Sequence, residues 1–464
     1  MINGVLQFYR LKLLTGNIPE VTMKFVFTAF LILLFAPMAR ADQNDLFVET
    51  ALDFVQKLSD HQFQEAARRF DARMRALTPP EKLEQIWDQL TTQTGDLDHF
   101  YFSRSERIQN YLVVYVTCVF RNAQLDAKIV FNPRIEIGGL FFLPVQSPEA
   151  WQAPEYADTT SFEERELSLG GDQPLPAVLT LPKKKGTFAA VILIHGSGPL
   201  DMDETIGPNK PFKDLAWGLA SAGIAVLRYT KRTKAYPEEI ARSKTFTVRE
   251  ETIDDVLQAI LLLKSQPQID STRIVLVGHS LGAMLIPRIA VQAPGVCAFV
   301  MMAAPVSPLE DLIVKQLKYV FMLDGKIDAQ EKQQLQTAIE QRDLIRSSRL
   351  TPETPKDQLP FNSAPDYWLD LKKYHPIQMA KKMTRPLLIL QGGRDYQTPP
   401  AEFHGWQTAL KGHANVTLKQ FPELNHLFMA GRGKSKPVEY LVPGHVAPQV
   451  VREIAEWIQT KCGN

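Results

Sequence analysis

The pattern of apolar and polar positions divides the chain into two parts of different character. Apolar residues at helix-like spacing near the start of the first part are Leu46, Val48, Ala51, Val55 and Leu58. Residues 111–142 are instead rich in β-branched and aromatic residues, in two runs separated by a polar turn, which is typical of adjacent strands. Helices followed by a small antiparallel sheet predict an α+β domain over residues 42–145. Residues 146–160 hold two prolines and little periodicity, and we interpret them as a linker.

The second part, residues 161–464, alternates short apolar runs with helical stretches. Runs predicted to be strands lie at 189–194, 224–227, 274–277, 298–302, 386–390 and 416–421. Runs of this kind, apolar on both faces, are typical of a parallel sheet covered on each side by helices. Repeated strand–helix units predict an α/β fold, with a doubly wound and mostly parallel sheet. Residues 306–384 interrupt the alternation with charged helical stretches, and we expect a helical insertion there.

The first 41 residues have the pattern of an export signal. Residues 25–36 form an apolar run directly after Met23 and a lysine, and Ala39 and Ala41 have the spacing that a signal peptidase recognises, so cleavage is expected before Asp42. A membrane anchor is the alternative, but a spanning helix needs about 20 apolar residues. Because a proline and a glutamate precede Met23, we expect translation to start at that methionine. The mature protein is expected to be exported, to the periplasm or the medium, without a stable membrane anchor.

Composition excludes several classes of protein. The 464 residues allow two to four domains, and 52 Lys and Arg against 51 Asp and Glu argue against a dedicated nucleic-acid binder. The three cysteines, Cys118, Cys297 and Cys462, form no CxxC pair, so at most one disulfide is possible. The metal-binding motif HExxH and the nucleotide-binding motifs GxGxxG and GxxxxGK[ST] do not occur in the sequence. We therefore expect neither a metal nor a cofactor.

The most informative motif is the pentapeptide 278–282, Gly-His-Ser-Leu-Gly, placed between an apolar strand and a predicted helix. In this context the motif predicts a sharp turn that presents Ser280 as a nucleophile. The helix that begins after the serine directs its first amides and its dipole towards the same point, which favours the negative charge formed on attack. A chance match in a strand–turn–helix is the alternative interpretation.

On this motif, on His-Gly-Ser-Gly-Pro at 195–199, and on the order of the residues that follow, the second part resembles an α/β-hydrolase. The resemblance implies an oxyanion hole made by the backbone amides of Ser197 and Leu281. It also implies a catalytic acid after a late strand, which matches Asp395 in Gln-Gly-Gly-Arg-Asp. The base is expected after the last strand, which matches His426, and His445 is its rival. More narrowly, the chain is similar to exported bacterial hydrolases that carry a small α+β domain of uncharacterised function.

Two further groups of residues leave alternatives open. Opposite charges follow two of the predicted strands, namely Arg228, Lys231 and Arg232 after one and Asp201, Asp203 and Glu204 after the other. They either pair and brace the predicted oxyanion loop or remain two solvated clusters. The resemblance also implies that the insertion at 306–384 covers the active site as a cap. Its aromatic residues, Tyr367, Trp368 and Tyr374, either line a substrate pocket or anchor the insertion to the core.

Together these patterns predict a serine hydrolase that cleaves small-molecule carboxylic esters through a Ser-His-Asp triad and an acyl-enzyme. A peptidase or amidase with the same triad is an alternative, because the motif does not distinguish the leaving group. A non-catalytic binding protein on the same scaffold is a second alternative. The role of residues 42–145, the oligomeric state and the identity of the ester are not determined by these patterns.

Overall fold

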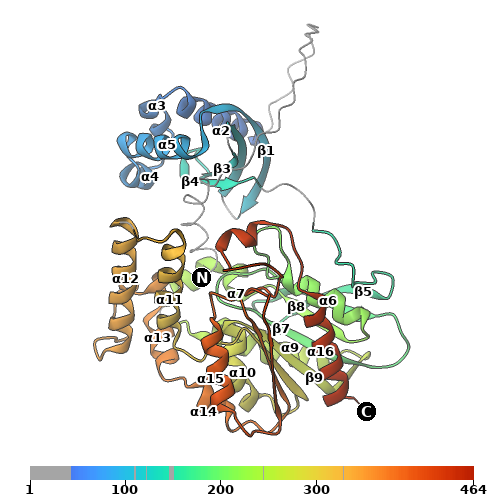
Figure 1. The fold of residues 1–464 in the computed structure, drawn as a ribbon. Coiled ribbons are helices and arrows are strands. Elements are labelled where there is room, and N and C mark those ends of the chain that lie inside the picture. The colour runs from blue at the N-terminus through green and yellow to red at the C-terminus, as the bar shows by residue number, and fades with distance from the viewer. Residues whose placement is uncertain are drawn as a thin grey trace. The chain divides into compact units, whose positions relative to one another are not determined.

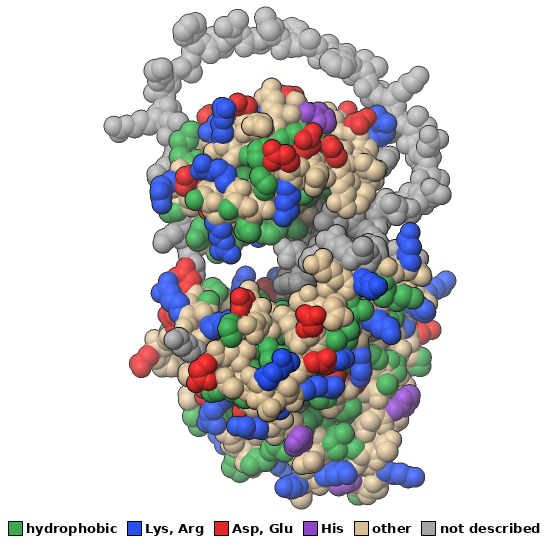
Figure 2. Space-filling view, turned by 90° about the vertical axis from the view of Figure 1, so that its left-hand side faces the viewer, with side chains coloured by type: hydrophobic (Ala, Val, Ile, Leu, Met, Phe, Trp, Pro, Cys, Tyr) green, Lys and Arg blue, Asp and Glu red, His purple; other side chains and the backbone are tan. Residues whose placement is uncertain are grey.

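The computed structural model describes residues 43–108, 111–121, 123–145, 151–243, 245–327 and 329–463. These residues fall into two compact units, which meet in the sequence near residue 148 (Figure 1). The predicted signal segment, 1–41, lies outside the described residues. Within the described ranges, no helix has the length and apolarity needed to cross a membrane. On the face seen in Figure 2, basic and acidic side chains are interspersed over each unit.

The smaller unit consists of helices followed by an antiparallel sheet, as the sequence predicts. Its helices are α2 (Gln43–Ser59), α3 (Phe63–Ala67), α4 (Ala72–Leu77) and α5 (Pro80–Thr94). Its strands, paired in the order β1-β2-β3-β4, are β1 (Leu97–Ile108), β2 (Tyr111–Phe120), β3 (Gln124–Phe131) and β4 (Ile137–Pro144). Alternate residues of β2, among them Val114 and Val116, pack with Phe54 and Trp87 of the helices into one core. The period-2 pattern of this strand therefore reflects one face turned towards the helices.

The larger unit is built on a mostly parallel sheet, which among the described residues has eight strands in the order β12-β11-β10-β9-β7-β8-β6-β5. The strands are β5 (Phe162–Leu169), β6 (Leu175–Pro182), β7 (Phe188–Ile194), β8 (Ala225–Tyr229), β9 (Ile269–His279), β10 (Ala298–Met302), β11 (Leu387–Gly392) and β12 (Val416–Phe421). β6 pairs antiparallel with β5 and β8, and the other pairs are parallel. The predicted α/β fold with a doubly wound sheet is confirmed.

Helices cover both faces of this sheet. The main ones are α6 (Pro211–Ser221), η1 (Arg249–Ile253), α9 (Asp254–Lys264), α10 (Leu281–Gln292), α15 (Pro400–Ala409) and α16 (Pro448–Lys461). α6 and α16 share one hydrophobic core with the sheet, while α9, α10 and α15 share the other. Short helices α7 (Arg232–Ala235), α8 (Pro237–Arg242) and η5 (Pro437–Leu441) lie in the connections. Because the core strands are buried on both sides, their sequences are continuous apolar runs.

The insertion between β10 and β11 is helical, as expected. Its helices are α11 (Leu309–Phe321), η2 (Met322–Asp324), α12 (Ala329–Arg346), η3 (Lys356–Gln358), η4 (Pro360–Asn362), α13 (Pro365–Lys372) and α14 (Pro376–Ala380). Two of its aromatic residues, Trp368 and Tyr374, contact the core of the larger unit. The indole of Trp368 is fully buried in the core shared with α9 and α10, and the hydroxyl of Tyr374 donates to the carbonyl of Met284 in α10. These contacts favour the anchoring interpretation.

Residues 151–160 of the predicted linker pack against the larger unit. The indole of Trp151 donates to Asp214 of α6, and the hydroxyl of Tyr156 donates to the carbonyl of Val446.

A disulfide joins Cys297, just before β10, to Cys462 at the end of α16, and its Cα atoms are 6.1 Å apart. It links positions separated by 165 residues in the sequence.

Candidate active site

Ser280 occupies a strained turn between β9 and α10. Its φ of 52° lies in the left-handed region, which a residue with a side chain adopts only when the surrounding structure holds it there. The turn also needs glycine at position 282, because a Cβ there would lie 2.4 Å from the carbonyl oxygen of Ile194 in β7. The amide of Ser280 donates to the carbonyl of Met302 in β10 at 2.9 Å. The turn thus sits at the carboxyl end of the sheet, where ligands bind in open α/β folds.

His426 lies beside Asp395, although 31 residues separate them in the sequence. Nδ1 of His426 is 2.7 Å from Oδ2 of Asp395, and both side chains are buried. The other carboxylate oxygen, Oδ1, accepts the backbone amides of Gln397 and Thr398, each at 2.8 Å. Gln391 donates to Oδ2 at 3.1 Å. The carboxylate is therefore fixed by its own loop and can orient the imidazole in one direction.

The rival histidine, His445, has a different partner. Its Nδ1 lies 3.0 Å from Oδ1 of Asp214 in α6, and the same carboxylate accepts the amide of Val446 at 2.9 Å. Its side chain is 35% exposed. Asp214 thus holds the chain just before α16, and His445 belongs to that arrangement.

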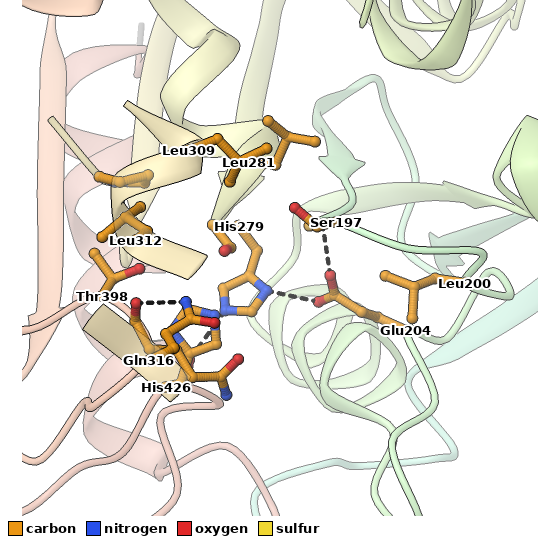
Figure 3. A pocket seen from close by; sticks show the side chains of 14 residues that line it. Ser197, Leu200, Glu204, His279, Leu281, Leu309, Leu312, Gln316, Thr398 and His426 are labelled. Carbon is orange, nitrogen blue, oxygen red and sulfur yellow. Dashed lines mark hydrogen bonds and ion pairs between the residues drawn. The ribbon is translucent and has the colours of Figure 1, made fainter. Parts of the chain in front are cut away.

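A cavity of about 420 Å³, counting space open to solvent, lies at the turn of Ser280 (Figure 3). It is lined by Gly196, Ser197, Leu200, Glu204, His279, Ser280, Leu281, Pro305, Leu309, Leu312, Gln316, Gln397, Thr398 and His426. Four of the five residues predicted for the site, Ser280, His426, Ser197 and Leu281, therefore border one cavity. The fifth, Asp395, lies behind the imidazole of His426. Trp368 and His445 are not among the fourteen residues that line the cavity.

The loop after β7 approaches the turn closely on its other side. A Cβ at Gly196 would lie 3.2 Å from the Cβ of Ser280 and 3.3 Å from a carboxylate oxygen of Glu204. Glycine therefore lets the backbone next to Ser197 come close to the serine. Leu281 is the first residue of α10, and an amide in the first turn of a helix has no acceptor within the helix. Both predicted oxyanion amides belong to backbone that borders the cavity.

The predicted pairing of opposite charges is partly realised. Nε of Arg228 lies 2.9 Å from Oδ1 of Asp203, as the bracing hypothesis expects. Burial raises the pKa of Asp203, but Arg228 and Lys210 together lower it, so the net shift is downward. Arg232 instead pairs with Asp255 in α9. Of these two ion pairs, the one between Arg228 and Asp203 joins the two predicted clusters.

Lys231 holds the predicted oxyanion loop through a backbone carbonyl. Its ammonium group, on a side chain that is 2% exposed, donates to the carbonyl of Gly196 at 2.7 Å and pairs with Glu251 at 2.6 Å. The hydroxyl of Tyr367, from the insertion, donates to the same Glu251 at 2.9 Å. Burial lowers the pKa of His195, at the start of the loop, to about 4. The loop is thus fixed through its backbone by charged side chains.

Some residues of the site are not indicated by the sequence patterns. Leu309, Leu312 and Gln316 of α11 line the cavity, and Nε2 of Gln316 donates to the carbonyl of Gln397 at 2.7 Å. Their i, i+3, i+7 spacing indicates that they share one helix face, but it does not indicate which surface this face contacts.

In the described part of the chain, no group of three or more His, Cys, Asp or Glu side chains is arranged to hold a metal ion.

Comparison with protein families gives two matches. Residues 191–440 match a family described as the alpha/beta hydrolase family. Residues 51–140 match a family described as a protein of unknown function (DUF3887). The first match contains Ser280, Asp395 and His426, and the second falls in the smaller unit.

Individual proteins are similar over different lengths. Esterase EstD of Thermotoga maritima is 38% identical over 414 residues, which are 89% of this chain and 95% of that protein. Among solved structures, Est1E from Butyrivibrio proteoclasticus is 15% identical with a TM-score of 0.41, covering 64% of this chain and 99% of that one. An acylaminoacyl peptidase of Pyrococcus horikoshii is 16% identical with a TM-score of 0.44, covering 78% of this chain and 56% of that one.

Proposed function

Because the chain belongs to the alpha/beta hydrolase family, we propose that it is a serine hydrolase that cleaves carboxylic esters of small molecules. Ser280 is the nucleophile, His426 the general base, and Asp395 the residue that orients and stabilises the imidazolium. The observation that carries the proposal is the 2.7 Å contact between His426 and Asp395 beside the cavity that Ser280 also lines. The similarity to a protein named as an esterase over 95% of its length supports ester hydrolysis.

The reaction follows from this arrangement. Oγ of Ser280 attacks the ester carbonyl carbon while His426 accepts the hydroxyl proton, and the carbonyl oxygen becomes an oxyanion next to the amides of Ser197 and Leu281. Collapse of this intermediate breaks the bond to the alcohol, which takes the proton from His426, and leaves an acyl group on Ser280. Water then attacks the acyl-enzyme with His426 again as base, and the carboxylic acid leaves.

Ser280→Ala is the direct test. Loss of such a nucleophile costs on the order of 10⁶ in kcat, so turnover of a p-nitrophenyl ester should fall to background while the melting temperature stays near that of the wild type. A fluorophosphonate probe should label the wild type and not this variant. Ser265→Ala, which removes an exposed hydroxyl at the end of α9, is the control and should keep both turnover and labelling. Normal turnover in Ser280→Ala would overturn the proposal.

The same preparation tests the two alternative functions. A peptidase or amidase would hydrolyse an aminoacyl p-nitroanilide at least as well as the ester of the same acyl group. A binding protein without catalysis would turn over neither substrate and would not react with the probe. For an esterase we expect kcat/KM to be much higher for the ester.

Export of the mature chain from Asp42 is part of the proposal. It is supported by the apolar run and alanine spacing of residues 25–41 and by the disulfide between Cys297 and Cys462, because disulfides persist in oxidising compartments. We further propose that residues 42–145 and 161–464 are separate domains. Mass spectrometry of the protein recovered outside the cytoplasm should give Asp42 as the first residue. Recovery of a chain that retains residues 25–36 would contradict cleavage there.

A further inference from the structure

Glu204 is a buried carboxylate at the cavity that the proposed mechanism does not use. Its side chain is 2% exposed, and its backbone has a φ of 52°, a second strained position beside that of Ser280. Oε1 accepts the amide of Gly196 at 2.8 Å, and Oε2 lies 3.0 Å from Nδ1 of His279. Figure 3 shows this carboxylate between the oxyanion loop and the imidazole. Each oxygen of Glu204 therefore faces another segment of the protein.

His279, directly before the nucleophile, makes a contact through each ring nitrogen. Nδ1 faces the Glu204 carboxylate, and Nε2 is 3.0 Å from the backbone carbonyl oxygen of His426. Both partners present only oxygen atoms to the ring, and one of them is a carboxylate, so a positively charged imidazolium suits this pair of contacts. Burial lowers the pKa of His279, but Glu204, the carbonyl of His426 and Asp395 together raise it, and the net shift is upward. Burial raises the pKa of Glu204, but His279, His195 and the amide of Gly196 together lower it, so the net shift is downward.

We propose that Glu204 and His279 form a positioning ion pair that fixes the oxyanion loop, the nucleophile turn and the loop of the general base relative to one another. Glu204 contacts Gly196 in the oxyanion loop, and His279, which directly precedes Ser280, contacts the backbone of His426. These segments come from distant parts of the sequence. The pair acts through these residues rather than on the substrate. This inference rests on the proposed function, because it assigns a role in the same reaction.

The pair has defined electrostatic surroundings. The charged and titratable groups that face it are Lys231, bound to the carbonyl of Gly196, His195 at the start of the oxyanion loop, and Asp395 with His426 on the opposite side. Because the pKa of His279 is raised, the ion pair is present below that pKa and is lost as the pH rises through it. Because the pKa of Glu204 is lowered, the pair is also lost when the pH falls through that lower value. Between these limits the three segments are held together.

The experiment compares Glu204→Ala, Glu204→Gln and His279→Gln with a matched control. Misplacing an oxyanion amide by about 1 Å costs roughly 10²-fold, so Glu204→Ala should lose about 10²-fold in kcat with KM little changed. Glu204→Gln keeps an oxygen for the Gly196 amide and should lose less. Without the counter-charge the alkaline limb of its kcat profile should move to lower pH. The inhibition constant of a trifluoromethyl ketone, which forms a tetrahedral adduct, should rise in parallel with the loss in kcat/KM.

Asp214→Asn is the control because Asp214 contacts a backbone amide and a histidine as Glu204 does, with one additional hydrogen bond from Trp151, elsewhere in the larger unit. Its carboxylate accepts a backbone amide, that of Val446, and lies 3.0 Å from Nδ1 of a histidine, His445, but none of these residues lines the cavity. It should lower the melting temperature and leave kcat and the inhibition constant within about twofold, a difference worth less than half of 1 kcal/mol.

Three results would overturn the positioning role. One is a folded Glu204 variant that keeps kcat/KM within about twofold of the wild type. Another is a loss that appears in KM alone or is matched by the Asp214→Asn control at equal stability. The third is an alkaline limb that is the same in Glu204→Gln and the wild type. If Glu204→Ala does not fold, Glu204→Gln and His279→Gln decide the question. Failure of this inference leaves Ser280-dependent labelling intact, whereas failure of the proposed function removes it.

Discussion

Trp368→Ala distinguishes an anchor of the insertion from a wall of the substrate pocket. Trp368 is fully buried in the core shared with α9 and α10, and its indole nitrogen donates to Ser363 at 2.7 Å. It lies on α13, whereas the cavity receives side chains of the insertion from α11. The substitution should therefore destabilise the fold and leave the substrate preference unchanged.

The size of the effect follows from the burial of the ring. Replacing a buried tryptophan by alanine typically costs about 3–5 kcal/mol through lost transfer free energy and the cavity that remains. Unfolding entropy near 60 °C is about 2.1 cal/mol/K per residue, which for the roughly 300 residues of the larger unit gives about 0.6 kcal/mol/K. The expected decrease in Tm is therefore about 5–8 °C.

Two measurements on the purified variant test this reasoning. Calorimetry gives the change in Tm, and kcat/KM for p-nitrophenyl esters of increasing acyl length, measured well below the transition, gives the substrate ranking. Phe361→Ala is the control, because this aromatic residue of the same insertion is 60% exposed and its loss should change neither quantity. A variant with an unchanged Tm and an altered order of acyl lengths would refute the anchoring role and assign Trp368 to the pocket.

Three further predictions concern residues whose partners the structure defines. His426→Ala should lose kcat on the order of 10⁶-fold while His445→Ala keeps most of it, and the reverse order in steady-state kinetics would reassign the base. Replacing Cys297 and Cys462 by serine should lower the free energy of unfolding in urea titrations by about 2–5 kcal/mol, because the bridge closes a loop of 165 residues. The substitutions should change kcat/KM little, and equal stability would contradict a structural role of the bridge. Lys231→Met leaves the carboxylate of Glu251 buried without its ion-pair partner, so it should lower the unfolding free energy by about 3–5 kcal/mol in the same titration. A stability equal to that of the wild type would show that this ion pair is dispensable.

Several features were determined by the sequence because they depend on short-range physical requirements. A pentapeptide with glycines on both sides of Ser280, preceded by an apolar run, specifies a strand, a strained turn and a helix within about twenty residues. The alternation of apolar strands and amphipathic helices similarly specified the α/β fold, since each element must bury its own apolar face. The order of helices and strands in residues 42–145 was predictable for the same reason.

Only the tertiary structure decided which residues meet across the fold. His426 and His445 both follow the last strand, and each lies beside a buried carboxylate, but the paths of the loops bring one to Asp395 and the other to Asp214. The partner of Glu204 could likewise not be predicted, because His279 is 75 positions away in the sequence and the basic residues at 228–232 were the expected partners. Local patterns fix the conformation of a segment through its own backbone and burial. A pairing between segments depends on where the packed sheet delivers their ends, and that position is set by all the strands and helices together.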